Sequence, residues 1–344
     1  MIDETAGARS HIAYFALGGT IASVPPAPGE PAQPGLSAAD IAGSIEGLDE
    51  VADVMGEDLM KVSSARLDLT HMLRLRDAAA AAVDAGADGV VVSQGTDSLE
   101  ETSYALDVLW DRAEPLVFTG AMRNPSLLSP DGAANLMAAV RTAASSQARD
   151  QGALVVLNDE VHAARYVRKT HTSNVATFGS PTVGRIGRLV EDRVELGLRV
   201  PRIPPMHVPS TVTIPPIALV TMTIGDDGRI LRTLPDLGYE GVVLAGMGGG
   251  HVAVEWVEPL RDLAARMPVV LASRAGAGEV LSKTYGYPGS EVALLEAGLL
   301  GAGALDPLKA RVRLALALAG GVPVAEAFAA TGTTTGSVTG SRVR

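Results

Sequence analysis

The 344-residue sequence contains no cysteine. Such a chain can form no disulfide framework, no thiolate metal site and no cysteine nucleophile. Aromatic residues make up only 3% of the chain, so stacking on bases or sugars is not expected to be its main means of recognition. The core therefore has to be built mainly from alanine, valine and leucine.

Positive charge is scarce as well, with 28 Lys and Arg against 39 Asp and Glu and a formal net charge of −11. Nucleic-acid binding needs cations that neutralise phosphates, so we expect no nucleic-acid partner. No apolar run approaches the roughly 20 residues that span a bilayer, so we expect no membrane partner. The segment Met1–Ser10 is polar and acidic and lacks the features of a signal peptide, which predicts a cytoplasmic location.

The six histidines show no metal-ligand spacing such as H-E-x-x-H, so we expect no zinc or other metal and interpret each as a surface or packing residue. They are His11, His71, His162, His171, His207 and His251.

Apolar strand patterns alternate with helical patterns through the first half of the chain. The expected strands are Ile12–Leu17, Gly89–Ser93, Leu116–Thr119 and Ala153–Leu157, and the expected helices are Leu73–Val83, Ser98–Leu109 and Asp131–Ala144. Uninterrupted apolar strands are typical of parallel sheets covered on both faces, which indicates an α/β fold. Ligands of such sheets bind beyond the carboxyl ends of the strands, so the polar residues there are the candidates for a site.

A proline-rich stretch, Pro201–Pro216, predicts a division into two domains. We expect a larger N-terminal α/β catalytic domain over residues 1–205, a linker over 206–216 and a smaller C-terminal α/β domain over 217–344. The second domain has strand patterns at Ile217–Ile224, Gly241–Ala245 and Val269–Ser273, and helical patterns at Glu255–Arg266 and Leu308–Ala319. The last segment, Thr331–Arg344, is expected to be a frayed tail.

A second proline-rich segment, Pro25–Gly35, directly follows the first strand and is not expected to form regular structure. It is either a surface loop or a lid over whatever that strand presents.

Two glycine-containing motifs follow predicted strands. Gly18-Gly19-Thr20 allows a sharp turn and close backbone approach to a ligand, but it lacks the G-x-G-x-x-G spacing of a dinucleotide site. In Gln94-Gly95-Thr96-Asp97-Ser98, the pair Ser98 and Glu101 fits a capping box. The capping box gives no role to Thr96 and Asp97, which precede the expected helix. The N-terminus of a helix is suited to stabilising an oxyanion, so these two residues are candidates for a catalytic site.

Further polar residues follow the next strands. After Thr119–Arg123, the residues Ser129 and Pro130 are typical of a helix cap and a first turn. Lys169 lies in Arg168-Lys169-Thr170, and alone it would be interpreted as a solvated side chain. Two threonines, an aspartate and a lysine suit acyl transfer, since a threonine hydroxyl needs a neighbouring base and a lysine can relay its proton.

Six segments then occur in order: Leu17-Gly-Gly-Thr-Ile-Ala22, Gln94-Gly-Thr-Asp-Ser-Leu-Glu-Glu-Thr102, Thr119-Gly-Ala-Met-Arg123, Val167-Arg-Lys-Thr170, Leu244-Ala-Gly-Met-Gly248 and Asp306-Pro-Leu-Lys-Ala-Arg311. Together they closely resemble the bacterial L-asparaginase family (the type I/II asparaginase–glutaminase group), over nearly the whole chain. The resemblance implies hydrolysis of the side-chain amide of L-asparagine to aspartate and ammonia without a cofactor, and weaker action on L-glutamine.

The resemblance also implies roles for individual residues. Thr20 would be the nucleophile, and Thr96, Lys169 and Asp97 would form a relay that activates a hydroxyl or water. Asp97 would also hold the α-amino group of the substrate, Ser64 (or its neighbour Ser63) the α-carboxylate, and the carbonyl of Ala121 the scissile amide. The remaining substrate-binding candidates are Gly19, Gly95, His251 and Glu291.

The sequence departs from the family pattern at three places. No tyrosine lies between Thr20 and Ser64, where the family carries a lid tyrosine; Tyr285 and Tyr287 are the candidates to replace it. His251 stands where the family often has Asn, and Ala65 where many relatives have Gln. Glu291 matches the acidic residue that the family sends across a subunit interface, which implies a homotetramer built as a dimer of dimers.

The sequence is compatible with three functions. The leading one is an amidohydrolase acting on L-asparagine. The second is an amino-acid-binding or sensing protein on the same scaffold, with little turnover, suggested by the absent lid tyrosine and by His251. The third, a dinucleotide-dependent oxidoreductase, is suggested only by the α/β pattern and Gly18-Gly19.

Overall fold

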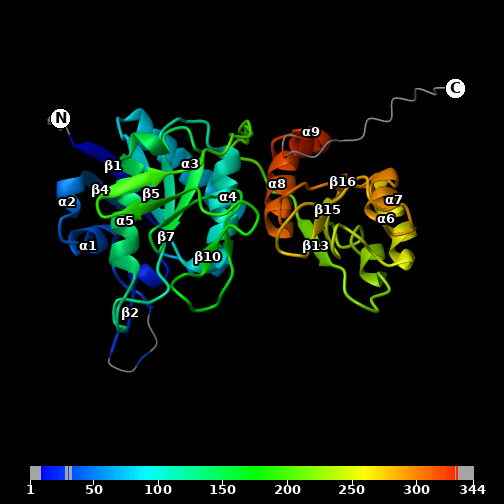
Figure 1. Ribbon diagram of the computed structural model, residues 1–344, viewed down its shortest axis with the longest axis horizontal. Coiled ribbons are helices and arrows are strands. Elements are labelled where there is room, and N and C mark those ends of the chain that lie inside the picture. The colour runs from blue at the N-terminus through cyan, green and yellow to red at the C-terminus, as the bar shows by residue number, and fades with distance from the viewer. Residues whose placement is uncertain (1–8, 28–29, 31–32, 330, 332–344) are drawn as a thin grey trace. The chain divides into compact units, whose positions relative to one another are not determined.

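The computed structural model describes residues 9–27, 30, 33–329 and 331 (Figure 1). The chain divides into two compact units, Met1–Pro205 and Met206–Arg344. Each unit is an α/β structure, as the sequence predicts. The predicted frayed tail lies outside the described residues except for Thr331, as do four residues of Pro25–Gly35 and most of the polar N-terminal segment.

In the described part of the N-terminal unit, the main sheet has eight strands. In spatial order they are β12 (Arg193–Leu196), β11 (Gly187–Val190), β8 (Glu160–Ala163), β7 (Ala153–Leu157), β6 (Leu116–Thr119), β5 (Gly89–Ser93), β1 (Ser10–Ala16) and β4 (Ala52–Asp58). The five strands from β7 to β4 are parallel, whereas β8, β11 and β12 add to them in antiparallel fashion. The predicted parallel sheet is therefore confirmed, but its strand β4 and the antiparallel extension are not among the strands predicted from the sequence.

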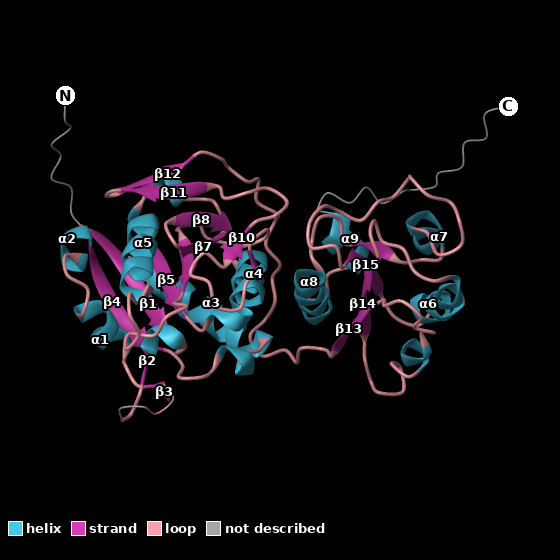
Figure 2. Cartoon of the chain, turned by 60° about the horizontal axis from the view of Figure 1, so that its bottom comes forward, coloured by secondary structure: helices cyan, strands magenta, loops and turns pink. Residues whose placement is uncertain are grey.

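Helices cover both faces of this sheet (Figure 2). On one face lie α1 (Ala38–Gly43), α2 (Leu48–Val51) and α5 (Gly132–Ala144); on the other lie α3 (Leu69–Asp84) and α4 (Leu99–Leu109). Because both faces are covered, Val90, Val91 and Val92 of β5 are all 0% exposed. Burying each such side chain contributes roughly 1.5–3 kcal/mol, which explains why the three central positions of the strand are all apolar.

Short elements connect these layers. They are the 3-10 turns η1 (Thr20–Ala22), η2 (Ser64–Arg66), η3 (Thr96–Ser98) and η4 (Ser146–Ala148), and the strand pairs β2 (Ser23–Val24) with β3 (Gln33–Pro34) and β9 (Arg168–Lys169) with β10 (Phe178–Gly179). The β2–β3 pair corrects the expectation that Pro25–Gly35 contains no regular structure. Its last residues pair with the segment before it, because a strand of two residues tolerates a proline at its end.

The outer edge of β4 is an edge of the sheet. Along this strand Asp53, Glu57 and Asp58 are exposed, and Met55 is 72% exposed. Charged side chains on an edge strand oppose pairing with a further strand.

In the described part of the C-terminal unit, four parallel strands form one sheet in the order β13 (Ile217–Thr221), β14 (Gly241–Gly246), β15 (Val269–Ser273) and β16 (Leu300–Gly301). The other elements are η5 (Arg229–Arg232), η6 (Val254–Trp256), α6 (Val257–Ala264), α7 (Glu291–Glu296), α8 (Pro307–Ala319) and α9 (Val324–Ala329). Helix α8 packs on the sheet, and α6 closes a core around Trp256 and Leu271.

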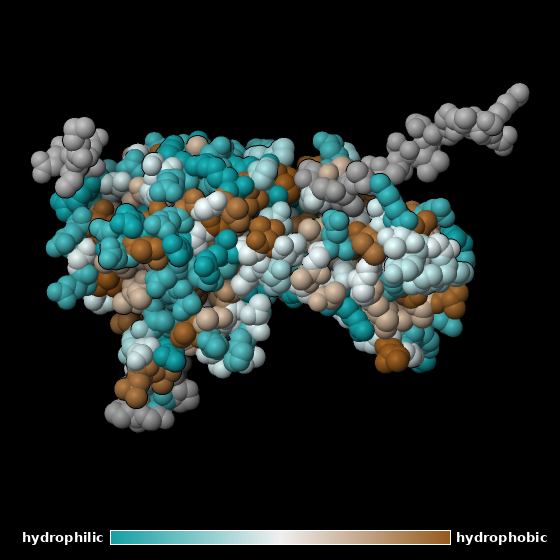
Figure 3. Space-filling model, viewed as in Figure 1, coloured by the Kyte–Doolittle hydropathy of each residue, from teal (hydrophilic) through white to brown (hydrophobic). Residues whose placement is uncertain are grey.

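Hydrophilic side chains cover most of the face seen in Figure 3, and the hydrophobic ones form small separate clusters. Among the described residues the most exposed large hydrophobic side chain is Ile224, at 94%. None of the described helices has the length and the apolar character required to cross a bilayer.

Candidate functional site

Three neighbouring parallel strands of the N-terminal unit end at the same level. Ala16 at the end of β1 is aligned with Ser93 of β5, which is aligned with Thr119 of β6. The loops that follow carry the motifs singled out in the sequence. Because their starting points are in register, the loops emerge side by side at the carboxyl edge of the sheet.

The first two loops touch through their glycines. Gly19 has φ +90°, and a Cβ at this position would overlap the backbone of Gly95. Only glycine allows this conformation together with this approach. Thr20 and Thr96 directly follow these glycines, so the contact brings the two predicted threonines onto adjacent loops. Thr20 is half-buried, whereas Thr96 is only 5% exposed.

A third loop brings Ser64 to the same place. A Cβ at Gly95 would lie 2.6 Å from Oγ of Ser64, so the serine packs directly on this glycine. Ser64 is buried and Ser63 exposed, which favours Ser64 of the two candidates. Ser98 donates its hydroxyl hydrogen to the carbonyl of Ser64 over 2.8 Å.

The contact between Ser98 and Ser64 corrects the capping-box prediction. Ser98 is the N-cap residue of α4, but its side chain makes no capping hydrogen bond. The hydroxyl instead joins two loops that are far apart in sequence, and this partner cannot be read from local spacing.

The ammonium group of Lys169 joins the predicted pair. Its Nζ lies 2.9 Å from Oγ1 of Thr96 and 2.7 Å from Oδ1 of Asp97. The lysine side chain is 14% exposed and that of Asp97 is 72% exposed. An amine between a buried hydroxyl and an exposed carboxylate can accept a proton from the hydroxyl while the carboxylate stabilises the resulting charge.

A pocket of about 360 Å³ opens beside this trio. Its lining residues are Asp97, Glu100, Lys169, Thr170, His171 and Thr172. His171 shapes the loop that forms part of this wall, since its Nδ1 accepts hydrogen bonds from the backbone N–H groups of Ser173 and Asn174 at 3.1 and 3.0 Å. The proposed relay therefore faces a space in which a small molecule can bind.

The loop after β6 completes the wall around Thr96. A Cβ at Gly120 would lie 3.1 Å from Cγ2 of Thr96, and Ala121 next to it is fully buried. Thr96 donates its hydroxyl hydrogen to Sδ of Met122 over 3.4 Å. The sequence analysis did not identify Met122 as a site residue, because a methionine carries no local signal of polar contact.

Asp131 fixes this loop. Its carboxylate accepts the backbone N–H groups of Met122, at 3.0 and 3.1 Å, and of Arg123, at 2.8 Å. The predicted cap by Ser129 and first-turn position of Pro130 are wrong, because α5 begins at Gly132 with Asp131 as its N-cap residue. The aspartate side chain makes no capping hydrogen bond to the helix backbone and holds the loop instead.

A second cluster of site candidates lies within the C-terminal unit. His251 Nε2 is 3.1 Å from Oε2 of Glu291, and His251 Nδ1 is 3.1 Å from the hydroxyl of Tyr287. The ring of Tyr285 packs edge-on against His251 with centroids 5.1 Å apart. Tyr285 and Tyr287 are 45% and 47% exposed, so the tyrosines form the outer part of the cluster.

Glu291 forms the inner part and is 0% exposed. Burial alone would raise the pKa of its carboxyl, but hydrogen bonds from the backbone N–H groups of Tyr285 and Thr284 and from His251 outweigh burial and lower the pKa. An ionised carboxylate makes Nε2 of His251 a donor and leaves Nδ1 to accept the Tyr287 hydroxyl hydrogen. Both carboxylate oxygens have partners in their own unit, and the groups that this cluster offers at its surface are the phenols of Tyr285 and Tyr287.

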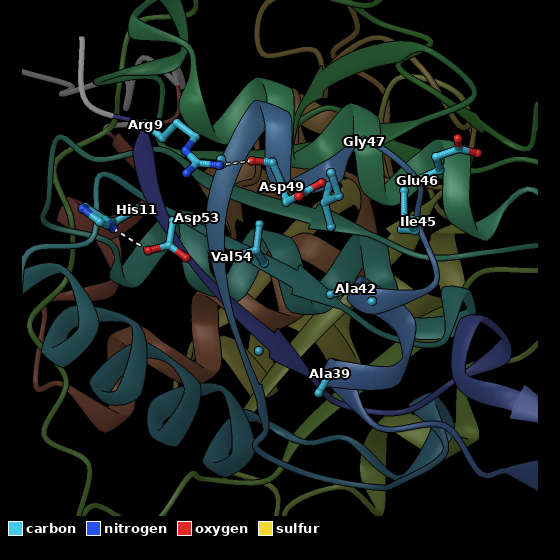
Figure 4. A pocket seen from close by; sticks show the side chains of 14 residues that line it. Arg9, His11, Ala39, Ala42, Ile45, Glu46, Gly47, Asp49, Asp53 and Val54 are labelled. Atoms are coloured by element: carbon cyan, nitrogen blue, oxygen red, sulfur yellow. Dashed lines mark hydrogen bonds and ion pairs between the residues drawn. The ribbon is translucent and has the colours of Figure 1, made fainter. Parts of the chain in front are cut away.

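A larger pocket of the N-terminal unit lies elsewhere, along the edge of β4, and has a volume of about 910 Å³ (Figure 4). Arg9 donates to the carbonyl of Asp49 there, and His11 Nδ1 is 3.1 Å from Asp53 Oδ2. These pairs are exposed, and no hydroxyl is placed beside a base among the lining residues. The lining residues therefore favour the smaller pocket, beside Lys169, as the candidate active site.

Histidines and acids of the described residues form no group of three or more that could hold a metal ion. His162 is 1% exposed, and burial lowers the pKa of its imidazole although Glu160 lies 3.3 Å away. His71 is part of the cap of α3.

Comparison with known proteins matches both units. The family model described as "Asparaginase, N-terminal" covers residues 11–202, and "Glutaminase/Asparaginase C-terminal domain" covers 216–328. An L-asparaginase of Bacillus licheniformis is 32% identical over 90% of this chain and 95% of its own length. A probable periplasmic L-asparaginase of Haemophilus influenzae is 33% identical over 90% of this chain and 88% of its own.

A solved structure agrees with these matches. The crystal structure of a probable cytoplasmic L-asparaginase from Campylobacter jejuni superposes with a TM-score of 0.84 at 30% sequence identity. The match covers 93% of this chain and 99% of that one.

Proposed function

The chain belongs to the asparaginase family, and on that premise we propose that it is an L-asparaginase, hydrolysing the side-chain amide of L-asparagine to L-aspartate and ammonia. The observation that carries this proposal is the placement of Lys169 Nζ within 2.9 Å of Thr96 Oγ1 and 2.7 Å of Asp97 Oδ1 beside a pocket. No cofactor is needed, since hydrolysis of an amide requires only a nucleophile, a proton relay and oxyanion stabilisation.

The first half of the proposed reaction forms an acyl-enzyme. Oγ1 of Thr20 attacks the amide carbon, and its proton passes to the substrate nitrogen. The C–N bond then breaks, ammonia leaves and the acyl group remains on Thr20 as an ester. Water attacks this ester in the second half, with its proton taken through Thr96 and Lys169, and releases aspartate and the free threonine.

The remaining candidates would hold the substrate. The exposed carboxylate of Asp97 suits an α-ammonium group, and the hydroxyl of Ser64 suits an α-carboxylate. The carbonyl of Ala121 would orient the scissile amide. Gly19 and Gly95 have no side chain, so their backbone could come close to the substrate. L-Glutamine is one methylene longer, a difference typically worth about 1–3 kcal/mol, so we expect weaker action on it.

We further propose that the protein is a homotetramer, a dimer of dimers, in which Tyr287 takes the place of the lid tyrosine in the site of a second copy. Its support is the exposure of this phenol together with its hydrogen bond to His251. Light scattering should give the tetramer mass. When T96V and Y287F chains, each expected to have reduced activity, are denatured together and refolded, the activity of the mixed tetramers should exceed that of either variant alone; no such gain would refute shared sites.

A cytoplasmic location is proposed from the similarity to the probable cytoplasmic L-asparaginase of Campylobacter jejuni. Fractionation of cells producing the full chain tests it.

Ammonia release from L-asparagine and L-glutamine tests the function itself. We expect activity in wild type and its loss in T20A, T96V and K169M. Full activity in folded T96V would reject the relay. Calorimetric binding of L-asparagine or L-aspartate by wild type without turnover would instead support the amino-acid-binding function.

A further inference from the structure

The hydroxyl of Thr96 has a second partner that the relay does not use. A threonine hydroxyl has one hydrogen to donate and lone pairs to accept. While Lys169 is an ammonium group, it donates to Oγ1 of Thr96 and cannot accept from it. The hydroxyl hydrogen then points to Sδ of Met122, 3.4 Å away.

The sulfur is held at this place through the backbone of its own residue. Asp131 accepts the N–H group of Met122, and Asn135 donates Nδ2 to Asp131 Oδ2 at 3.1 Å and to the carbonyl of Gly120 at 2.9 Å. The backbone on both sides of Ala121 is thereby fixed. Met122 is half-buried, so small molecules in water can reach this part of the site.

We propose that Met122 is a positioning residue whose thioether is the resting acceptor of the Thr96 hydroxyl hydrogen, and that oxidation of this sulfur blocks hydrolysis. The inference rests on the proposed function of Thr96 and Lys169. A thioether is a weak acceptor. It orients the hydroxyl in the resting site, yet it releases the hydrogen once Lys169 is neutral and can accept it.

A stronger acceptor at the same position would retain the hydrogen. Hydrogen peroxide transfers one oxygen atom to the thioether, so that an S=O bond forms, the O–O bond breaks and water leaves; the sulfur is oxidised by two electrons and the peroxide reduced. The sulfoxide oxygen is polar and would hold the Thr96 hydroxyl away from the lysine.

The charged and titratable groups around Lys169 come from three elements. They are Asp97 and Glu100 on the η3–α4 segment, Arg168 on β9 and His171 on the following loop, with Asp131 and Arg123 on the side of Met122. All of them stay in place when only Met122 is changed, so differences between Met122 variants report on the sulfur position.

Two variants separate positioning from packing. M122L keeps the volume without an acceptor, and M122Q supplies a strong acceptor. We expect kcat of M122L to fall about threefold, because the resting acceptor of the Thr96 hydroxyl is lost, and kcat of M122Q to fall at least about tenfold, with little change in KM in either variant.

Peroxide treatment gives an independent readout. Wild type should lose activity, M122L should keep it, and M55L should lose it as wild type does, because Met55 is an exposed methionine on β4. Equal inactivation of M122L and wild type, or an unchanged kcat in folded M122Q, would overturn the inference. Absence of ammonia release from untreated wild type would instead refute the proposed function.

Discussion

Gly19 and Gly95 lie backbone against backbone where the loops after β1 and β5 meet. A methyl group on Gly19 would overlap the backbone of Gly95, and the φ of +90° would be strained for alanine. We expect G19A to abolish ammonia release and to lower the free energy of unfolding by more than about 2 kcal/mol, because strain and steric overlap act together.

The matched control for this change is G47A. Gly47 also has a positive φ, +75°, but no atom lies within 4 Å of a Cβ placed there. Backbone strain alone should then lower the free energy of unfolding of G47A by about 1 kcal/mol, and the variant should still release ammonia. Thermal unfolding and ammonia release measure both variants, and equal effects at the two glycines would contradict the importance of the contact.

Replacement of Lys169 by methionine should reduce kcat by about 10²–10⁴, since the group that takes the proton of Thr96 is lost while the length of the side chain is kept. The lysine lies in a two-residue strand and is 14% exposed, so the fold should be retained. K61M serves as the control, because Lys61 is 57% exposed and pairs with Asp58 on the surface. A K169M enzyme as active as K61M would exclude Lys169 from the reaction.

The two tyrosines near His251 offer a direct comparison. Both are exposed to a similar extent, but the hydrogen bond to His251 Nδ1 comes from the hydroxyl of Tyr287. We expect Y287F to lose at least about tenfold in kcat and Y285F to change little, if the phenol takes part in proton transfer. Steady-state kinetics on L-asparagine measure the difference. The reverse order would assign the role to Tyr285.

The buried carboxylate of Glu291 should make stability depend on pH. Hydrogen bonds lower its pKa in the folded chain below the unfolded value of about 4.3, so the folded state favours the ionised form. The stabilisation of the folded state by the ionised Glu291 is therefore complete above about pH 4.3 and is lost as the pH falls through the lower pKa of the folded chain. The Tm difference between wild type and E291Q should be constant from about pH 5 to 7 and shrink below pH 4.3.

Glu258 provides the reference for that measurement, because its side chain is 71% exposed and pairs with Arg261 on the surface. The Tm of E258Q should follow that of wild type throughout. Parallel curves for wild type and E291Q down to pH 3 would show that Glu291 is not preferentially ionised in the folded state.

The sequence predicted the parallel strands and the polar residues at their ends because both signals are local. Residues 90–92 form an apolar run because β5 is buried on both faces, and Thr96 and Asp97 follow the end of this strand closely. The strands β8, β11 and β12 were missed because they are short and partly exposed, and thus lack a continuous apolar run.

Contacts between loops that are far apart in the chain could not be predicted from local sequence patterns. Ser98 and Asp131 both stand at helix starts, yet their side chains serve other loops. The burial of Glu291 and its bond to His251 join residues 40 positions apart. Local spacing is compatible with a helix cap at Ser98 and Asp131 and with a surface acid at Glu291. The tertiary packing determines the partners that these side chains actually have.

The acidic outer edge of β4 has a consequence for handling the protein. Asp53, Glu57 and Asp58 repel the same edge of another molecule, which hinders strand addition between molecules. Concentrated salt screens this repulsion while the exposed Met55 remains, so we expect edge-to-edge association through β4 to increase with salt concentration.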